Sequence, residues 1–595
     1  MLLAIVAALY INDASCTSCH ANIVHTYHAV GMSKSFYRPR QDDAIEDFSK
    51  LPFKHAKSGD VMELRWRNGR LIFRRVNGRS VFEQPVDWIL GSGHHARTYL
   101  YQTPNGELYQ LPLAWYTQTK EWGMAPGYDR RDHDGVLRRA RHECLFCHNA
   151  YPGDGFQVTG DKVSHPSPVT RDLSPGNAYP DGSQATGDKA SHPSPVTRSL
   201  SPGYWSNQGL PAQLPEGIGC QRCHGPGSEH VALASAGAGN AQLRAAIVNP
   251  AHLDAQRRND VCYECHMQPS VAIPGLRRFG RDIYSYRPGQ PLHDYLARVD
   301  IVDGEIPRPE RFEINHHPYR LEQSRCFRES GTLSCLTCHD PHRKTSNVSP
   351  VCLQCHAEAH RASENCATCH MPKRRTQDVV HVVMTDHRIG VYRDLPKLLS
   401  PREERDPVID DIEVDDPLYR AVAGVRAGST SAARQLETLL ADTPSKEVEP
   451  YLDLAAAQLR QKRYDAVEAT ARLILARAPD HPLALEWLGL ARANLGARDE
   501  GIELLRKAAA LDPQRVETLY NLGLQLAARG SRDEAIAVFA RAVAGRPNFV
   551  LAWFHLGNAR AAKGDRDGAV AAWRRALDID PRFARAAAAL SNPPP

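Results

Sequence analysis

Seven short cysteine motifs constrain this chain more than any other feature of its 595 residues. Each motif reads Cys-x-x-Cys-His, and together they use fourteen of the fifteen cysteines. Three of them crowd into residues 335–370, as CLTCH, CLQCH and CATCH. The other four lie upstream, as CTSCH at 16–20, CLFCH at 144–148, CQRCH at 220–224 and CYECH at 262–266. Any fold that the chain adopts must accommodate these seven units.

This motif is the attachment signature of c-type haem. Its two cysteines form thioethers with the porphyrin, and the histidine binds the iron from one face. A zinc knuckle or a redox dithiol also uses paired cysteines, but neither requires a histidine after the second one. Only 27 residues are histidine, yet a histidine ends all seven motifs. The sequence therefore predicts seven covalently bound haem c groups.

The residues that would hold them follow from the motifs. The predicted thioether residues are Cys16, Cys19, Cys144, Cys147, Cys220, Cys223, Cys262, Cys265, Cys335, Cys338, Cys352, Cys355, Cys366 and Cys369. The predicted proximal iron ligands are His20, His148, His224, His266, His339, His356 and His370. The remaining cysteine, Cys326, is interpreted as a small, at least partly buried residue without a catalytic role.

Second axial ligands are sought among the remaining histidines and methionines. After the first motif, Met32 competes with His25 and His28, and a methionine would raise the reduction potential. Met32 is equally compatible with a place in a helix core. His94 and His95 lie beside glycines that would let the backbone approach a flat ligand, although a polar loop would look the same.

Five further histidines complete the prediction. His230 lies six residues beyond a proximal histidine, which directs it toward a neighbouring haem rather than its own. The pairing of ligands with irons stays open, and His293, His316 and His317 are weaker candidates. The predicted distal set is Met32, His95, His230, His342, His360, His381 and His387.

The region between the first two motifs has a different pattern. Polarity alternates on both sides of Asn68-Gly69 and again around Asn105-Gly106, and Asn-Gly between such runs is a strong hairpin signal. We expect a small β-subdomain at 60–118 within a haem-binding domain at 16–400. Residues 159–203 contain an 18-residue sequence twice, rich in Pro, Gly and Ser, and are interpreted as a loop.

The remaining boundaries follow from composition. The apolar start, MLLAIVAALY within 1–15, resembles the remnant of a secretory signal, with a buried N-terminal segment as the alternative. Residues 401–416 are acidic and lack periodic apolar residues, which indicates a linker. No stretch is long and apolar enough to cross a membrane. A net charge of +5 is mild for this length and gives no reason to expect a nucleic-acid partner.

Residues 417–590 contain no cysteine and repeat every 34 residues. Gly489, Gly523 and Gly557 share this spacing, as do three further glycines and four prolines. A 34-residue period with small and apolar residues at equivalent positions is typical of tetratricopeptide repeats, which stack into an α-solenoid. The predicted fold is therefore mainly α: a haem-packed multihaem cytochrome domain with a small β-hairpin subdomain, followed by this solenoid.

The first 390 residues resemble exported multihaem c-type cytochromes of the group that includes the tetrahaem cytochrome of ammonia oxidisers and hydroxylamine oxidoreductase. GIGCQRCHGPGSEH, LSCLTCHDPH and NCATCHMP carry the resemblance. It implies closely stacked haems, with His230 and His342 as distal ligands of neighbouring haems. No motif here ends in lysine, and the lysine-ligated catalytic haem of the related pentahaem nitrite reductase is therefore not indicated.

These observations predict a periplasmic or extracellular electron carrier, because c-type haem is attached outside the cytoplasm. Redox proteins are the expected partners, and the repeats would bind a protein or peptide or mediate self-association. An oxidoreductase acting on a small nitrogen or sulfur compound at one open haem is the alternative, and a scaffold is the third. The arginines at 277–328 would stabilise substrate charge or, as we prefer, pair with haem propionates. No catalytic residue is assigned.

Overall fold

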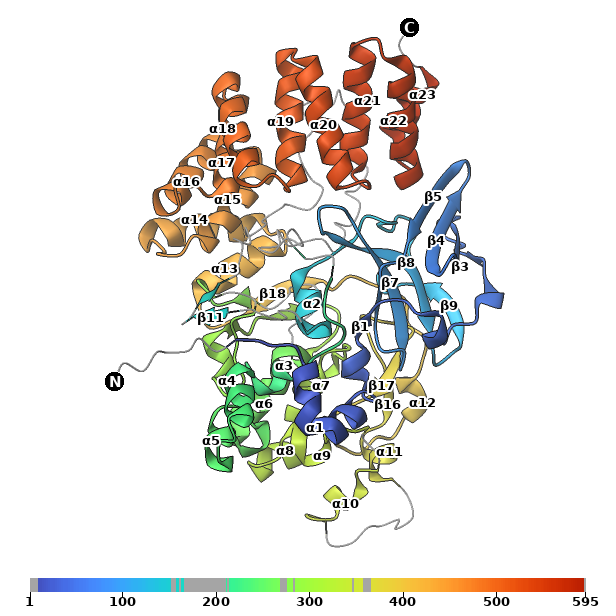
Figure 1. Cartoon of the computed structure of the whole chain (residues 1–595), viewed down its shortest axis with the longest axis vertical. Coiled ribbons are helices and arrows are strands. Elements are labelled where there is room, and N and C mark those ends of the chain that lie inside the picture. Colours follow the sequence, from blue (N-terminus) through green and yellow to red (C-terminus); the bar gives the residue numbers. More distant parts are fainter. Residues whose placement is uncertain are drawn as a thin grey trace.

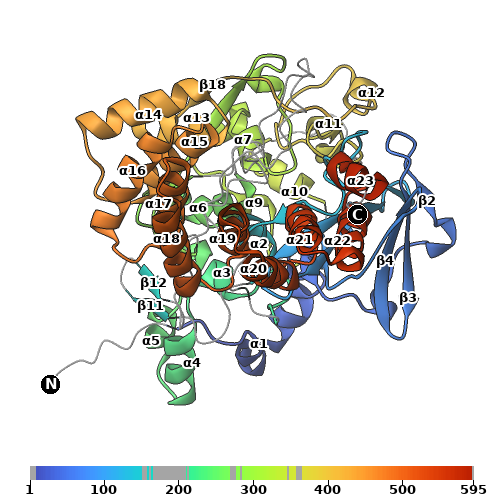
Figure 2. The ribbon, with the colours of Figure 1, turned by 90° about the horizontal axis from the view of Figure 1, so that it is seen from above.

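The computed structural model describes residues 9–150, 157–159, 162–164, 210, 213–267, 276–281, 284–344, 347–356 and 365–592. Most of the duplicated segment at 159–203 and the candidate ligand His360 lie outside the described residues. A body made of short helices and small sheets lies beneath a curved array of longer helices (Figures 1 and 2).

The β-structure of the body forms two main antiparallel sheets. The predicted hairpin at Asn68-Gly69 is present, and both residues adopt the positive φ that its tight turn needs. A four-stranded sheet has the order β2 (Phe53–Lys54), β3 (Val61–Arg67), β4 (Arg70–Asn77) and β5 (Ser80–Pro85). A six-stranded sheet has the order β1 (Phe36–Tyr37), β6 (Trp88–Leu90), β7 (Ala96–Gln102), β8 (Leu108–Tyr116) and β10 (Arg139–Ala140), with β9 (Glu121–Met124) on β8. The β-structure is thus larger than the predicted pair of hairpins.

Short helices make up most of the rest of the body. They are α1 (Ala14–Tyr27), α2 (His142–His148), α3 (Gln221–His224), α4 (Ser228–Ser235), α5 (Asn240–Ala245), α6 (Ala255–His266), α7 (His317–Glu322), α8 (Arg325–Ser330), α9 (Cys335–Cys338), α10 (Ser349–Cys352), α11 (Cys366–His370) and α12 (Leu395–Leu398).

Two-stranded sheets connect these helices. They pair β11 (Gln157–Thr159) with β12 (Lys162–Ser164), β13 (Leu276–Arg277) with β14 (Leu296–Ala297), and β16 (Lys373–Arg375) with β17 (Val383–Thr385). Within the predicted linker at 401–416, β18 (Ile409–Glu413) pairs with β15 (Asp300–Asp303). This segment is therefore held against the body.

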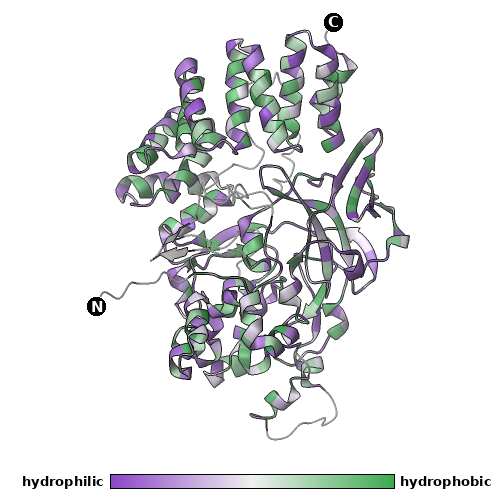
Figure 3. Cartoon of the chain, in the orientation of Figure 1, coloured by the Kyte–Doolittle hydropathy of each residue, from purple (hydrophilic) through white to green (hydrophobic). Residues whose placement is uncertain are grey.

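The C-terminal array consists of antiparallel helix pairs. They are α13 (Pro417–Arg426) and α14 (Thr430–Asp442), α15 (Glu449–Arg460) and α16 (Tyr464–Arg477), α17 (Pro482–Asn494) and α18 (Arg498–Leu511), α19 (Val516–Arg529) and α20 (Arg532–Gly545), α21 (Val550–Ala562) and α22 (Arg566–Ile579), with α23 (Ala584–Ser591) at the end. Figure 3 shows hydrophobic and hydrophilic residues on each helix, as expected when one face packs on its neighbours.

The periodic glycines explain the spacing. A Cβ atom at Gly523 would lie 2.6 Å from the ring of Phe539, and one at Gly557 would lie 2.4 Å from the indole of Trp573. In these two repeats the first helix can therefore approach the second only because a glycine stands at the crossing. Gly489 holds the same position in the pair α17–α18, whereas the pair α15–α16 has Ala455 there.

The array is fastened to the body at both ends. Near its start, Tyr419 stacks on Phe279 with ring centroids 4.2 Å apart, and its hydroxyl accepts a hydrogen bond from the Phe279 amide. Near its end, Phe554 and Trp573 belong to the same buried cluster as Phe82 of β5. The solenoid is therefore an integral part of the molecule.

Candidate haem-binding centre

Each of the seven Cys-x-x-Cys-His units lies in or beside a short helix of the body. Unit one lies in α1, unit two in α2, unit four at the end of α6 and unit seven in α11. The helical turn places both cysteines of a unit on one side, as attachment to one flat ring requires. None of the fifteen cysteines forms a disulfide.

Four proximal histidines face a second histidine ring from elsewhere in the chain. The ring centroids of His20 and His230 lie 6.3 Å apart, and those of His224 and His342 lie 5.9 Å apart. Metal–imidazole bonds are about 2 Å long, so two rings that share one ion have centroids roughly 6 Å apart. Both pairs therefore have the spacing needed for one iron between them.

Two further pairs have the same spacing. His339 faces His387 at 6.1 Å, and His266 faces His317 at 5.8 Å. From the sequence, His317 is only one of the weaker ligand candidates. Only the packing of α7 against α6 brings it to His266.

The other predicted distal ligands are placed less directly. Burial, and after it the positive charge of Lys373, lowers the pKa of His95. Lys373 lies three residues after unit seven, so His95 lies near that unit. His381 packs on Tyr116, with centroids 4.9 Å apart. Met32 lies in a short 3₁₀ turn, Gly31–Lys34. These assignments stay predictions.

Burial sets the protonation state of several candidate ligands. Desolvation lowers the pKa of both His148 and His387 to about 4. At neutral pH each ring is therefore uncharged and keeps a lone pair, which is the form that binds a metal.

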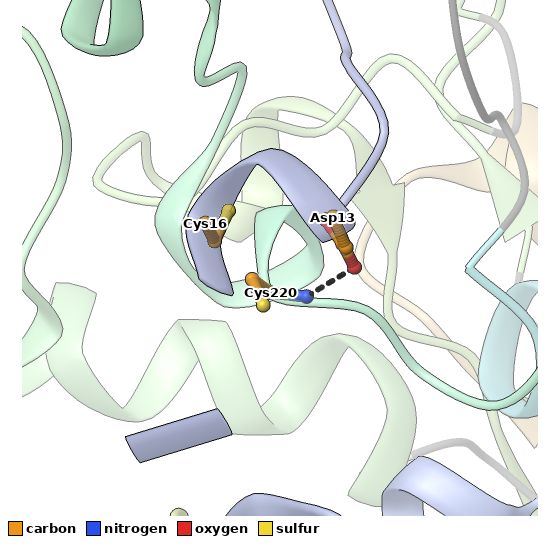
Figure 4. Close-up of side chains that lie close together, drawn as sticks. All are labelled: Asp13, Cys16 and Cys220. Atoms are coloured by element: carbon orange, nitrogen blue, oxygen red, sulfur yellow. Dashed lines mark hydrogen bonds between the residues drawn. The ribbon is translucent and has the colours of Figure 1, made fainter. Parts of the chain in front are cut away.

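Asp13 holds units one and three together. Its carboxylate accepts a hydrogen bond from the Cys220 amide at 2.8 Å, and the Cys16 and Cys220 thiols lie beside it (Figure 4). A Cβ atom at residue 219 would lie 2.0 Å from Asp13 Oδ2, so a glycine is needed there. Two thiols and a carboxylate at this spacing could also hold a divalent ion, but both thiols belong to haem motifs.

Contacts between thiols give the order of the units. Cysteines of different units approach within hydrogen-bonding reach in four places: Cys16 with Cys220, Cys147 with Cys265, Cys262 with Cys335, and Cys352 with Cys366. Unit one is thus beside unit three, unit four is beside both two and five, and unit six is beside seven. These thiol contacts join the units into three groups, and the Arg222–Glu264 ion pair links units one and three to units two, four and five.

Two arginines near this cluster, Arg222, which is buried, and Arg277, which is half-buried, have side-chain N–H groups without a protein acceptor. Arg222 and Arg277 both lie 4.2 Å from the ring of Phe146, and Glu264 is the carboxylate common to them. Nε of Arg222 and Nη1 of Arg277 are buried without a hydrogen-bond partner. Buried guanidinium groups need anionic partners. Haem carboxylates would supply them, so these residues fit the group that the cysteines predict.

The comparisons concern the array. A model of the tetratricopeptide repeat matches residues 520–583. Among similar solved structures, MamA is 25% identical over 26% of this chain and 90% of its own, with a TM-score of 0.24. The tetratricopeptide protein YrrB, described as having an unusual peptide-binding site, is 22% identical over 27% of this chain and 82% of its own, with a TM-score of 0.24. TTC0263 of Thermus thermophilus is 22% identical over 29% of this chain and 95% of its own, with a TM-score of 0.26. No curated protein matches the chain.

The C-terminal region is therefore a helical solenoid of the tetratricopeptide class. Its repeats suit a role in binding proteins or peptides. Among the helices of the described part of the chain, none has the length and apolarity needed to span a membrane.

Proposed function

We propose that this protein is an exported heptahaem c-type cytochrome that carries electrons between redox partners, with its tetratricopeptide array contributing to protein docking. Haem c accepts and donates single electrons at potentials set by its ligands and surroundings. The observation that carries the proposal is the set of four histidine pairs, each including the histidine of a Cys-x-x-Cys-His unit.

These pairs explain why electron transfer is favoured over catalysis. An iron held between two imidazoles has no open position for a substrate, so at least four of the seven irons would only exchange electrons. The protein keeps the rings oriented through backbone contacts. His224 Nδ1 lies 2.7 Å from the Val248 carbonyl oxygen, and His230 Nδ1 lies 2.9 Å from that of Leu243, which leaves Nε2 of each free to face the metal.

In this proposal, the protein around the ligands would neutralise the haem carboxylates and keep the haems close together. Arg222 and Arg277 would neutralise haem carboxylates in a dry interior. The close approach of thiols from different units would keep consecutive groups near one another, so that electrons can pass along the cluster. Attachment of c-type haem outside the cytoplasm is the basis for proposing export.

The mass and spectrum of the purified protein test the proposal. Expressed with a cytochrome maturation system, the chain should carry seven haems by intact mass and by the pyridine haemochrome assay. Electron paramagnetic resonance should show low-spin iron with two nitrogen ligands for at least four haems. A mass equal to that of the bare polypeptide, from a host that matures other cytochromes, would refute it.

One unit favours the alternative, an oxidoreductase for a small nitrogen or sulfur compound. His148 is half-buried, and among the described residues it has no ring contact with a second histidine. Arg222 and Arg277 lie close to unit two through Phe146, where their charge could stabilise an anion. High-spin iron that binds nitrite or hydroxylamine and is lost in a His148→Met variant would support this alternative. A wholly low-spin holoprotein would exclude it.

A further inference from the structure

We propose that the surface around unit seven is the docking site for an acidic electron-carrier protein. This inference rests on the proposed function, because it assigns an end of the haem cluster to a partner. We call this surface the unit-seven face and define it by two groups of exposed residues. The apolar group is Val391, Leu395 and Leu399, and the basic group is Lys373, Arg393, Lys397 and Arg402.

The apolar group is tied directly to the proposed proximal ligand. His370 Nδ1 lies 2.9 Å from the Gly390 carbonyl oxygen, and the Gly390 amide donates to the His370 carbonyl at 3.0 Å. Val391 follows at once and is 85% exposed, the highest value among the large exposed apolar residues of the described chain. Cys369 of the same unit is also exposed. An electron carrier could therefore come close to unit seven here.

The basic group lacks counter-ions. None of its four members forms an ion pair with a residue that the structure describes. Lys373 instead donates to the Thr385 hydroxyl at 3.0 Å. Three acidic residues, Asp394, Glu403 and Glu310, are exposed nearby, and Glu310 already pairs with Arg374, so the positive charges of the face still exceed the negative ones.

Of the neighbouring arginines, Arg375 adds to the excess, whereas Arg374 and Arg405 are paired with carboxylates. The guanidinium of Arg375 donates hydrogen bonds to the backbone carbonyls of Val380, Leu399 and Ser400. These acceptors are neutral, so the charge of Arg375 stays uncompensated. Partial burial first, and then the charges of Arg374, Arg375 and Arg405, lower the pKa of Arg402. Positive groups held together in this way attract an anionic surface.

The size and make-up of the face suit a transient redox encounter. Such interfaces are small, often below about 1,200 Å² in total, and charge around them raises the association rate. The face lies on the body near α11 and α12, away from the array (Figure 1). A partner seated here would not compete with one bound to the repeats.

Two charge-reversal variants of the holoprotein test the proposal. Arg393→Glu with Lys397→Glu alters the face, and Arg79→Glu with Arg244→Glu makes the same change at exposed sites elsewhere. Each pair would lower the formal charge from +5 by four units. The probe is reduced plant-type ferredoxin, an acidic protein with a potential of about −400 mV. Stopped-flow absorbance measures haem reduction, and fluorescence anisotropy of labelled ferredoxin measures binding.

We expect the face variant to lower the bimolecular rate and the affinity about tenfold or more at low ionic strength. The control should change both by less than about twofold, and the difference should vanish at about 0.5 M salt, where screening is strong. Equal effects of both variants, or a wild-type rate that does not depend on salt, would overturn the proposal.

Two other roles of the unit-seven face can be distinguished from docking of an acidic carrier. A dimer in light scattering that Leu395→Glu abolishes would assign the face to a second copy of the chain. A changed haem spectrum in Val391→Ser would mean that this residue covers the haem itself. Either result overturns docking. If the protein carried no haem, the proposed function would fail, while the anisotropy measurement would still decide whether the face binds an acidic protein.

Discussion

Replacing Arg546 tests the attachment of the array to the body. Its Nε donates to Glu107 Oε2 at 2.5 Å, and its Nη2 also contacts Glu107 and Glu517. Arg139 contacts Glu107 at 2.7 Å and Glu517 at 3.9 Å. Two arginines and two glutamates thus form a neutral cluster, in which the side chain of Arg546 is 6% exposed and that of Glu107 is 2% exposed.

The magnitude follows from this burial. Removing one partner of a buried ion pair leaves an uncompensated charge and costs about 3–5 kcal/mol. Arg546→Met keeps much of the side-chain volume, so the loss should come from the stranded carboxylates. Adding Glu517→Leu removes the one excess negative charge and leaves Arg139 paired with Glu107 at 2.7 Å, so this double variant should recover most of the loss.

The assay is denaturant unfolding of the holoprotein, followed by tryptophan fluorescence and by cleavage within 401–416. Arg541→Met, at an exposed site on α20, is the matched control and should change the free energy of unfolding by less than about 0.5 kcal/mol. A loss below about 1 kcal/mol for Arg546→Met would refute the buried cluster. So would a double variant no more stable than the single one.

Three further predictions follow from the structure. Gly523→Ala should destabilise the array by about 1–3 kcal/mol in thermal unfolding, because its Cβ would meet the Phe539 ring at 2.6 Å. His230→Ala should leave seven haems by mass but convert one from low-spin to high-spin in electron paramagnetic resonance, because His20 would lose the facing ring at 6.3 Å. Burial lowers the pKa of His55, although its hydrogen bond to Asp129 acts in the opposite direction. Its contribution to stability should therefore be constant above about pH 7 and fall as the pH drops below about 6.5, where only the unfolded chain takes up the proton. His55→Gln should remove up to about 1.4 kcal/mol per pH unit of that slope in urea titrations.

Each of these predictions has a control. Gln525→Ala on the same helix as Gly523 introduces no clash and should be nearly neutral. His252→Ala removes an exposed histidine that should leave the spin state unchanged. His293→Gln, with a side chain 76% exposed, should not alter the pH dependence. An unchanged spin state in His230→Ala, a neutral Gly523→Ala, or equal pH slopes for the two glutamine variants would contradict the respective argument.

Local patterns predicted the features that depend on local geometry. The repeats were recognisable because Gly523 and Gly557 meet an aromatic ring within their own helix pair, which fixes a period. The hairpin at Asn68-Gly69 followed from backbone preferences of those two residues. Features that need a distant partner left no such trace. β18 forms only because β15, more than 100 residues earlier, offers an edge.

The candidate haem ligands show the same division. The motif predicts the proximal histidines, because both cysteines and the ligand lie within five residues. His317 could not be ranked from its neighbours, since the contact with His266 depends on how α6 packs against α7. The contact between the rings of His20 and His230 likewise joins residues 210 positions apart and forms only in the tertiary structure.

The way the array is attached decides how its role can be tested. Deleting residues 417–592 would expose the carboxylate of Glu107 and uncover Phe279 and Phe82, because the array covers these groups. Loss of electron flow after such a deletion would therefore reflect damage to the body as much as loss of docking. Charge reversals on the exposed sides of α18 and α20, at Arg498 and Arg541, leave those contacts intact. A partner that binds the array should respond to them, whereas a partner that binds the unit-seven face should not.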